Sequence, residues 1–127
     1  MSEQKLQDIQ IDVDTAYIAS SSEPEAARYV FAYSITIKNT GNIEAQLLSR
    51  HWIITDANGK VQEVHGEGVV GEKPHLQPGE SFQYTSGAVI ETSVGAMQGS
   101  YDLLDSDGEK FSATIPPFSL SIPRTLH

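Results

Sequence analysis

Three glycines, Gly66, Gly68 and Gly71, match the spacing G-x-G-x-x-G of a phosphate-binding loop. In a dinucleotide-binding fold, such glycines connect a strand to a helix, and the amides at the start of that helix bind the phosphate groups. Pro74 and Pro78 exclude a helix at this place. Two interpretations remain: a structural loop whose glycines adopt positive φ, or a nest of inward-pointing amides that binds an anion without a helix.

The acidic side chains within this loop favour the structural interpretation. Glu67 and Glu72 would repel a bound anion at short range. A divalent cation between the protein and the anion would offset that repulsion. The alternative function is therefore a small-ligand sensor that binds pyrophosphate or a nucleotide polyphosphate at residues 66–71, with or without a metal ion.

Histidines and carboxylates near the glycines are candidate metal ligands. His65 and His75 flank the loop and could approach each other across it to bind a divalent metal ion. The carboxylates that could complete such a site are those of Glu63, Glu67 and Glu72. Because the spacing matches no established ligand pattern, the competing interpretation is that these histidines, like His51 and His127, are ordinary exposed side chains.

Other patterns associated with metal binding or catalysis are incomplete. Residues 105–109, DSDGE, begin like a calcium-binding loop but lack the later carboxylates and final glutamate of an EF-hand, which favours a hairpin turn. Ser86 and Ser100 have glycine neighbours but match no nucleophile motif. With no cysteine in the chain, thiol nucleophiles, disulfides and cysteine-bound metals are excluded. We therefore expect no enzymatic activity and no cofactor.

Length and charge restrict the class of protein. With 127 residues we expect one domain, residues 1–127, with its core over about 8–120 and short, loose termini. The net charge of −9 would repel nucleic acid, and the basic residues are scattered singly. No apolar stretch approaches the ~20 residues of a membrane span, and no export signal is recognisable. These features favour a cytoplasmic protein without direct nucleic-acid binding or membrane insertion.

Alternating apolar residues predict that strands position these groups. The strongest alternation runs through Tyr29, Phe31, Tyr33, Ile35 and Ile37. Since no helical period is convincing, we expect an all-β fold: an antiparallel two-sheet sandwich of seven to eight strands, immunoglobulin-like or fibronectin type III-like. The strands are expected at residues 9–17, 29–38, 45–55, 61–64, 82–84, 97–103 and 111–115, with an edge continuation at 118–120 after two prolines.

Turn chemistry predicts two hairpins and one crossing between the sheets. Asn58-Gly59 is a strong hairpin signal after the third expected strand, and residues 105–108, DSDG, predict a second hairpin near the end of the chain. Residues 76–82, LQPGESF, fit a tight turn at a sheet-to-sheet corner, with Tyr101 as a buried aromatic nearby. Trp52 suits the core of such a sandwich.

The sequence resembles the ApaG family. The resemblance is carried by the segments HGEGVVGEKPHLQPGESFQYTSG, VGAMQGSY and FSATIPPFSL and extends over nearly the whole chain. It implies a fibronectin type III-like or immunoglobulin-like sandwich, found alone in bacteria and as an interaction domain in eukaryotic F-box proteins and a DNA-polymerase-delta-interacting protein. It also implies a link to cobalt resistance and magnesium efflux, and it places the family's glycine motif on Gly66, Gly68 and Gly71.

These features together predict an interaction module. The expected function is to bind a protein partner of unknown identity through an exposed sheet edge, or through residues 66–71 and their surroundings. Self-association through the same edge would produce a homo-oligomer.

Overall fold

Eight antiparallel strands make up most of the computed structural model, which describes residues 4–123. The strands are β1 (Ile9–Tyr17), β2 (Tyr29–Asn39), β3 (Ala45–Asp56), β4 (Val61–Glu67), β5 (His75–Leu76), β6 (Ser81–Ile90), β7 (Val94–Asp105) and β8 (Lys110–Ser121). Two single-turn 3-10 helices, η1 (Ala19–Ser21) and η2 (Pro24–Ala26), connect β1 to β2. Among the described residues, no helix is long and apolar enough to cross a membrane.

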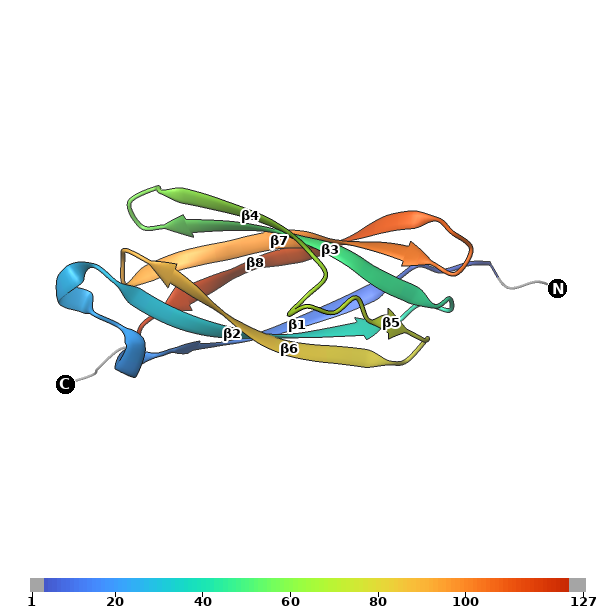
Figure 1. The fold of residues 1–127 in the computed structure, drawn as a ribbon, viewed down its shortest axis with the longest axis horizontal. Coiled ribbons are helices and arrows are strands. Elements are labelled where there is room, and N and C mark those ends of the chain that lie inside the picture. Colours follow the sequence, from blue (N-terminus) through green and yellow to red (C-terminus); the bar gives the residue numbers. More distant parts are fainter. Residues whose placement is uncertain (1–3, 124–127) are drawn as a thin grey trace.

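The strands form two sheets, which are the upper and lower layers in Figure 1. The three-stranded sheet has the order β1-β2-β6, and the five-stranded sheet has the order β4-β3-β7-β8, with β5 paired to β3 beyond the end of β4. The expected all-β antiparallel sandwich is confirmed. β5 was not expected because two residues are too few to show alternation, and β6 and β7 are longer than the expected segments.

The core lies between the facing sides of the two sheets. Trp52 of β3 is 2% exposed, and its ring centroid lies 5.3 Å from that of Tyr33 in the opposite sheet. Phe118 of β8 meets the same indole edge-on at 5.9 Å. Such aromatic contacts each contribute about 1 kcal/mol beyond the burial of area. Tyr101 is fully buried nearby, so the predicted core positions of this tyrosine and of Trp52 are confirmed.

The β3–β4 and β7–β8 hairpins close with the same turn. Asp56 and Asp105 end β3 and β7, and in each case one carboxylate oxygen accepts hydrogen bonds of 2.9–3.0 Å from the amides two and four residues further on. Gly59 and Gly108 occupy the position three residues on, with φ of 83° and 87°. Both predicted hairpins are confirmed. The carboxylate of Asp105 holds its own turn, which favours the hairpin interpretation of DSDGE over a calcium loop.

The two sides of the sandwich, where the edges of the sheets meet, differ from each other. On one side β1 contacts β8. β8 continues through Pro116 and Pro117, although its register with β7 shifts there. The interruption expected at the two prolines is therefore a bulge within an edge strand, where a missing N–H is tolerated.

On the opposite side, β4 and β6 are the edge strands, and Gln62 Nε2 of β4 donates to the carbonyl of Val89 in β6 at 3.3 Å. The connection of residues 68–74 descends from the end of β4 toward the lower layer before it turns back to β5 (Figure 1). Val69 in this connection is fully buried, so it fills the core from this side.

The chain crosses between the sheets directly after β5. Asn39 of β2 is buried, and its Nδ2 donates to the carbonyl of Leu76 at 2.9 Å. The amide of Gly79 donates to the carbonyl of Asn39 at 2.8 Å, which ties the turn to the sheet that β6 then joins. The predicted sheet-to-sheet corner is confirmed.

Candidate functional site

Polar side chains form two rows across the outer face of the five-stranded sheet. Side chains alternate between the two faces of a strand, so cross-strand partners form rows that point alternately outward and inward. The outward histidine row consists of His65, His51, Ser100 and Thr114, on β4, β3, β7 and β8. The outward aspartate row consists of Glu67, Ser49, Asp102 and Ser112 on the same strands. Between them, toward the core, lies the inner row of Gly66, Arg50, Tyr101 and Ala113.

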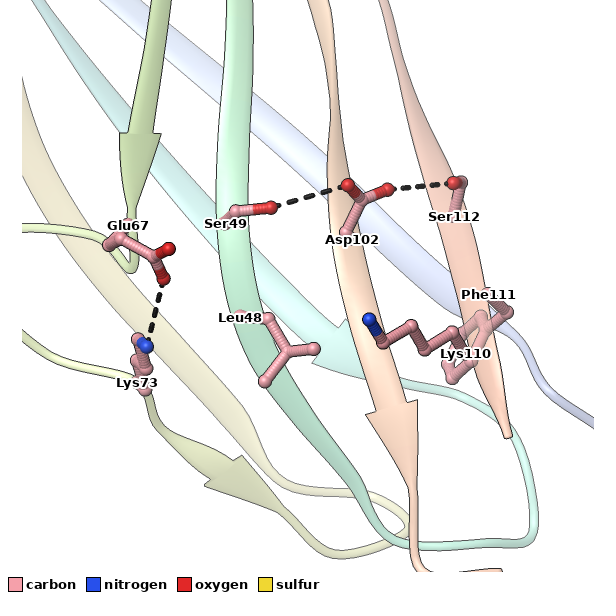
Figure 2. Close-up of a pocket in the computed structure, with 8 residues that line it drawn as sticks. All are labelled: Leu48, Ser49, Glu67, Lys73, Asp102, Lys110, Phe111 and Ser112. Atoms are coloured by element: carbon pink, nitrogen blue, oxygen red, sulfur yellow. Dashed lines mark hydrogen bonds and ion pairs between the residues drawn. The ribbon is translucent and has the colours of Figure 1, made fainter. Parts of the chain in front are cut away.

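A shallow groove of about 410 Å³ follows the aspartate row (Figure 2). Asp102 lies at its centre, where Ser49 Oγ donates to one carboxylate oxygen at 3.2 Å and Ser112 Oγ donates to the other at 2.9 Å. Leu48 and Phe111 supply the apolar part of the lining. A neighbouring depression of about 370 Å³ extends to the histidine row and shares three lining residues with the groove. The outer face therefore carries an elongated trough lined mostly by polar residues.

The charges in the groove balance. Lys73 Nζ lies 2.8 Å from Glu67 Oε2, and first the hydrogen bond from this lysine and then its charge lower the pKa of Glu67. Lys110 extends into the groove from β8 (Figure 2). Two ammonium groups thus face the carboxylates of Glu67 and Asp102, which gives the groove no excess of positive charge to attract a polyphosphate.

The histidine row ends in a cluster of possible metal ligands. The rings of His51 and His65 are stacked, with centroids 4.1 Å apart and planes within 8° of parallel. Glu63 shares this face of β4, and its Oε1 lies 3.2 Å from His51 Nε2. The ligand atoms of the three side chains lie within 4.8 Å of one another. Since Glu63 and His65 are exposed and His51 is half-buried, solvent reaches the cluster.

The cluster differs from the metal site expected from the sequence. The structure groups His65 with His51 and not with His75 and Glu67. The reason is the path of the chain: β4 and β5 pair with successive parts of β3, so His65 is opposite His51 whereas His75 is opposite Gln46. Five residues of β3 correspond to about 16 Å, which prevents the two flanking histidines from meeting across the loop.

Three amides in the connection of residues 68–74 donate hydrogen bonds within the protein. The amide of Gly68 donates to a carbonyl of β3 at 2.8 Å, and the amides of Val69 and Glu72 each donate to the other's carbonyl at 2.8 Å. Val70 and Gly71 between them have φ of 43° and 80°, as in a type I′ turn. These amides do not converge on a common point outside the chain, which is evidence against an anion nest at the glycine motif.

Each glycine of the motif has its own structural reason. Gly66, expected in the loop, belongs to β4, and a Cβ there would lie 2.6 Å from the guanidinium of Arg50. At Gly68, φ is 61° and a Cβ would lie 2.3 Å from the carbonyl oxygen of Glu72. Gly71 has positive φ in open space. The spacing G-x-G-x-x-G here results from three separate local constraints: the Arg50 side chain at Gly66, a positive φ with a close carbonyl at Gly68, and a positive φ at Gly71.

Arg50 lies where an anion would bind in a phosphate loop. Its Nη1 donates to the carbonyl oxygen of Glu67 at 3.1 Å and to that of Gly68 at 2.9 Å. The motif therefore directs carbonyl groups toward a cationic side chain of its own chain. This is the opposite polarity to the amides that a phosphate requires.

Sequence reasoning missed the partners of two candidate residues, although a signal for one of them was present. The predicted hairpin brings β3 and β4 together, and the observed three-residue loop of residues 57–59 sets the register, because His51 and His65 each lie seven residues from Asn58 at its centre. A two-residue turn at Asn58-Gly59 would instead place His51 opposite Gly66. No comparable signal identifies Arg50, because its contacts depend on the course of a loop further along the chain.

The outer face shows no activated serine among residues 4–123. The hydroxyls of Ser49 and Ser112 donate to Asp102, and the imidazole of His51 contacts Glu63. Activation of a serine requires a hydrogen bond to a general base that can take its proton, most often an imidazole.

The class of protein follows from the fold. Two antiparallel sheets with β1, β2 and β6 in one layer and the remaining strands in the other form an immunoglobulin-like or fibronectin type III-like β-sandwich. Its distinguishing features are the polar trough on the outer face and the connection of residues 68–74 at one side.

Comparison with known proteins shows the family. The ApaG domain model matches residues 19–105, and the chain belongs to the ApaG family. Protein ApaG of Thiobacillus denitrificans is 60% identical and that of Azoarcus sp. is 57% identical, each over 127 residues that cover both chains completely. The crystal structure of an ApaA protein from Bordetella pertussis superposes with a TM-score of 0.92 at 47% identity, covering 95% of this chain and 98% of that one. The predicted family is confirmed.

Proposed function

We propose that this ApaG-family domain is a non-catalytic module that binds a protein partner at the side of the sandwich bordered by β4 and β6. The observation that supports this most is the position of the exposed apolar side chains. Among residues 4–123, six large apolar side chains are exposed, and four of them lie on β4, on β6 or in the connection between β4 and β5. These four are Val61, Val64, Val70 and Val89.

Val70 is the most unusual of the four. Its φ of 43° is a conformation that β-branched residues rarely adopt, and 57% of its surface is exposed. Such a conformation costs about 1–3 kcal/mol, and here the buried side chain of Val69 anchors the turn. An apolar side chain held in solvent at the tip of a strained turn is typical of a binding loop.

β4 offers unpaired backbone groups beside these valines. It pairs with β3 along one edge only, so its other edge can accept an added strand. The opposite edge of the same sheet is β8, whose Pro116 and Pro117 remove two donors from the ladder. Strand addition is therefore favoured at β4 over β8.

The charge of the domain indicates the kind of partner. An extended segment that pairs with β4 would present apolar side chains to the valines, and basic flanks would be attracted by the net charge of −9. A second copy of the same chain would carry the same charge and be repelled. We therefore favour a heterologous partner over self-association.

Site-specific photo-crosslinking in cells tests this proposal. A photoreactive residue at Val64 or Val70 should capture the same partner, which mass spectrometry would identify. Val94 is the matched control, because it is also an exposed valine but lies at the start of β7. Val70→Asp should reduce the captured amount about tenfold, equivalent to ~1.4 kcal/mol of binding free energy, whereas Val94→Asp should not.

Equal capture from Val94 and Val70 would contradict the proposed surface. The same holds for undiminished capture in a folded Val70→Asp variant. Size-exclusion chromatography with light scattering tests the preference for a heterologous partner, since a dimer that Val64→Lys dissociates would favour self-association instead.

The polyphosphate sensor has less support, because the amides of Gly68, Val69 and Glu72 donate within the protein and Arg50 occupies the motif. Calorimetric titration with pyrophosphate and with diadenosine tetraphosphate, each with and without magnesium or cobalt, tests it directly. We expect no heat at millimolar ligand and no hydrolysis. If one of these ligands binds and Arg50→Ala abolishes the binding, the sensor would become the leading function again.

A further inference from the structure

Two imidazoles and a carboxylate lie together on the outer face of the β3–β4 hairpin. His51 is directly opposite His65 in the ladder, and Glu63 is two residues from His65 on the same face. Paired strands hold the Cβ atoms of opposite residues about 4.5–5.5 Å apart. The backbone therefore fixes the origins of all three side chains, in contrast to a site assembled from loops.

We propose that His51, His65 and Glu63 bind a first-row transition-metal dication such as Zn²⁺ or Ni²⁺. Imidazole nitrogens together with one carboxylate oxygen suit these ions, whereas Mg²⁺ and Ca²⁺ prefer sites made of oxygen ligands. Three protein ligands leave at least one coordination position open to water or to a ligand from another molecule. The site adjoins the surface proposed for the protein partner, because Glu63 and His65 lie on β4, but its ligands point away from the core along the histidine row.

Side-chain rotation alone brings the three ligand atoms onto one ion. Around a tetrahedral ion with bonds of about 2.0 Å, ligand atoms lie roughly 3.3 Å apart. His51 Nε2 and Glu63 Oε1 are already separated by 3.2 Å. All three ligand atoms lie within 4.8 Å of one another, and the exposed ring of His65 is free to turn by the remaining distance.

The charges on the same face favour a cation. The neighbouring aspartate row places the carboxylates of Glu67 and Asp102 beside the histidine row. Lys73 at this end of the trough pairs with Glu67 at 2.8 Å, so its ammonium group is directed to that carboxylate. Lys110 balances Asp102 in the same trough, so the attraction for a dication comes from Glu63 within the cluster and from the net charge of −9.

Zn²⁺ titration of the full-length protein without an affinity tag tests the site. Calorimetry should show one ion per chain, and His65→Gln should weaken binding at least tenfold, since loss of even a supporting group costs about 10–100-fold. His75→Gln is the matched control. His75 is also an exposed histidine beside a carboxylate, with Nδ1 3.0 Å from Glu44 Oε1, but it lies outside the cluster.

Nuclear magnetic resonance locates the ion independently of affinity. Substoichiometric Ni²⁺ should broaden the ring-proton signals of His51 and His65 before those of His75. Far-UV circular dichroism shows whether each variant is folded. The His51→Gln and Glu63→Gln variants should each weaken Zn²⁺ binding in the same way as His65→Gln.

Several results would overturn this proposal. One is the absence of heat and of chemical-shift changes with millimolar Zn²⁺. Another is full affinity in the folded His65→Gln variant, or an equal loss in His75→Gln. A stoichiometry of one ion per two chains would also exclude it, because the three ligands belong to a single chain. Displacement of Zn²⁺ by an equal concentration of Mg²⁺ would exclude an imidazole site.

Discussion

The inner row and the histidine row run side by side across the same four strands, but their side chains serve opposite purposes. In the inner row, the guanidinium of Arg50 passes over Gly66 and bonds to the connection of residues 68–74. Tyr101 in the same row is fully buried and shares a hydrogen bond with Tyr84 of the opposite sheet. In the histidine row, by contrast, the imidazoles face solvent.

A step of one residue along β3 therefore separates a structural position from a position available to ligands. The glycine motif, which resembles a nucleotide-binding loop in the sequence, has a structural role. The histidine pair, which matches no motif, occupies positions that are available to ligands. The sharpest way to examine this contrast is to compare how much stability each row contributes.

The largest loss of stability should follow from Gly68→Ala. Its positive φ disfavours a side chain, and the new Cβ would lie 2.3 Å from the carbonyl oxygen of Glu72. The two effects together should cost about 3 kcal/mol in the free energy of unfolding measured with urea. Gly71→Ala is the control, since its φ is also positive but its surroundings are open, and it should cost about 1 kcal/mol. Equal losses would show that the contact with Glu72 is unimportant.

The next largest effect should be a loss of the protein's stability at alkaline pH. Burial raises the pKa of Tyr84 to about 12, although its hydrogen bond with Tyr101 acts in the opposite direction, and burial also raises the pKa of Tyr101. In the unfolded chain both ionise near pH 10. The stability linked to these protons is therefore fully present below about pH 10 and is lost as the pH rises through about 12.

Ultraviolet titration of the tyrosinate band measures this effect. The chain has five tyrosines, and part of the absorbance should rise only together with unfolding, as followed by circular dichroism. Ionisation of all five near pH 10 in a folded protein would contradict burial of the pair.

A smaller loss should follow from Arg50→Ala. The variant loses two hydrogen bonds from a charged donor to the carbonyls of Glu67 and Gly68, which should cost about 1–2 kcal/mol because the arginine is partly solvated. Hydrogen exchange should accelerate first in residues 68–74. An acceleration spread evenly over both sheets would show that Arg50 supports the fold generally and not this connection.

The smallest effect should come from the histidine row. His65→Gln removes an exposed ring whose contacts lie at the surface, so the free energy of unfolding without metal should change by less than about 0.5 kcal/mol. Thermal unfolding with and without a chelator provides the measurement. A loss comparable to that of Arg50→Ala would mean that the stacked histidines are structural, and the contrast between the two rows would fail.

Most of the fold could be predicted because its signals are local. Alternation marked β1 and β2, and the Asn58-Gly59 turn predicted that β3 and β4 form a hairpin. The second aspartate turn did the same for β7 and β8. β5 escaped prediction because it is held by tertiary pairing with β3 and not by its own pattern.

The site was less predictable because its groups come from different strands. His65 and Glu63 were named as candidates, but their partner His51 lies on the neighbouring strand and becomes apparent only from the register of the hairpin. His75 was expected nearby because it is close in sequence. Two residues that are close along the chain need not be close in space, because the connection between them can place the second residue further along the same edge of a sheet.

The two identical aspartate turns also bear on how quickly the protein folds. Each turn closes a hairpin of neighbouring residues, and such hairpins form within about 1–10 μs. The ladder between β3 and β7 joins His51 to Ser100, about 50 residues apart, and must bring distant segments together. We therefore expect the β3–β4 and β7–β8 hairpins to form early, and the docking of β3 against β7 to limit the folding rate.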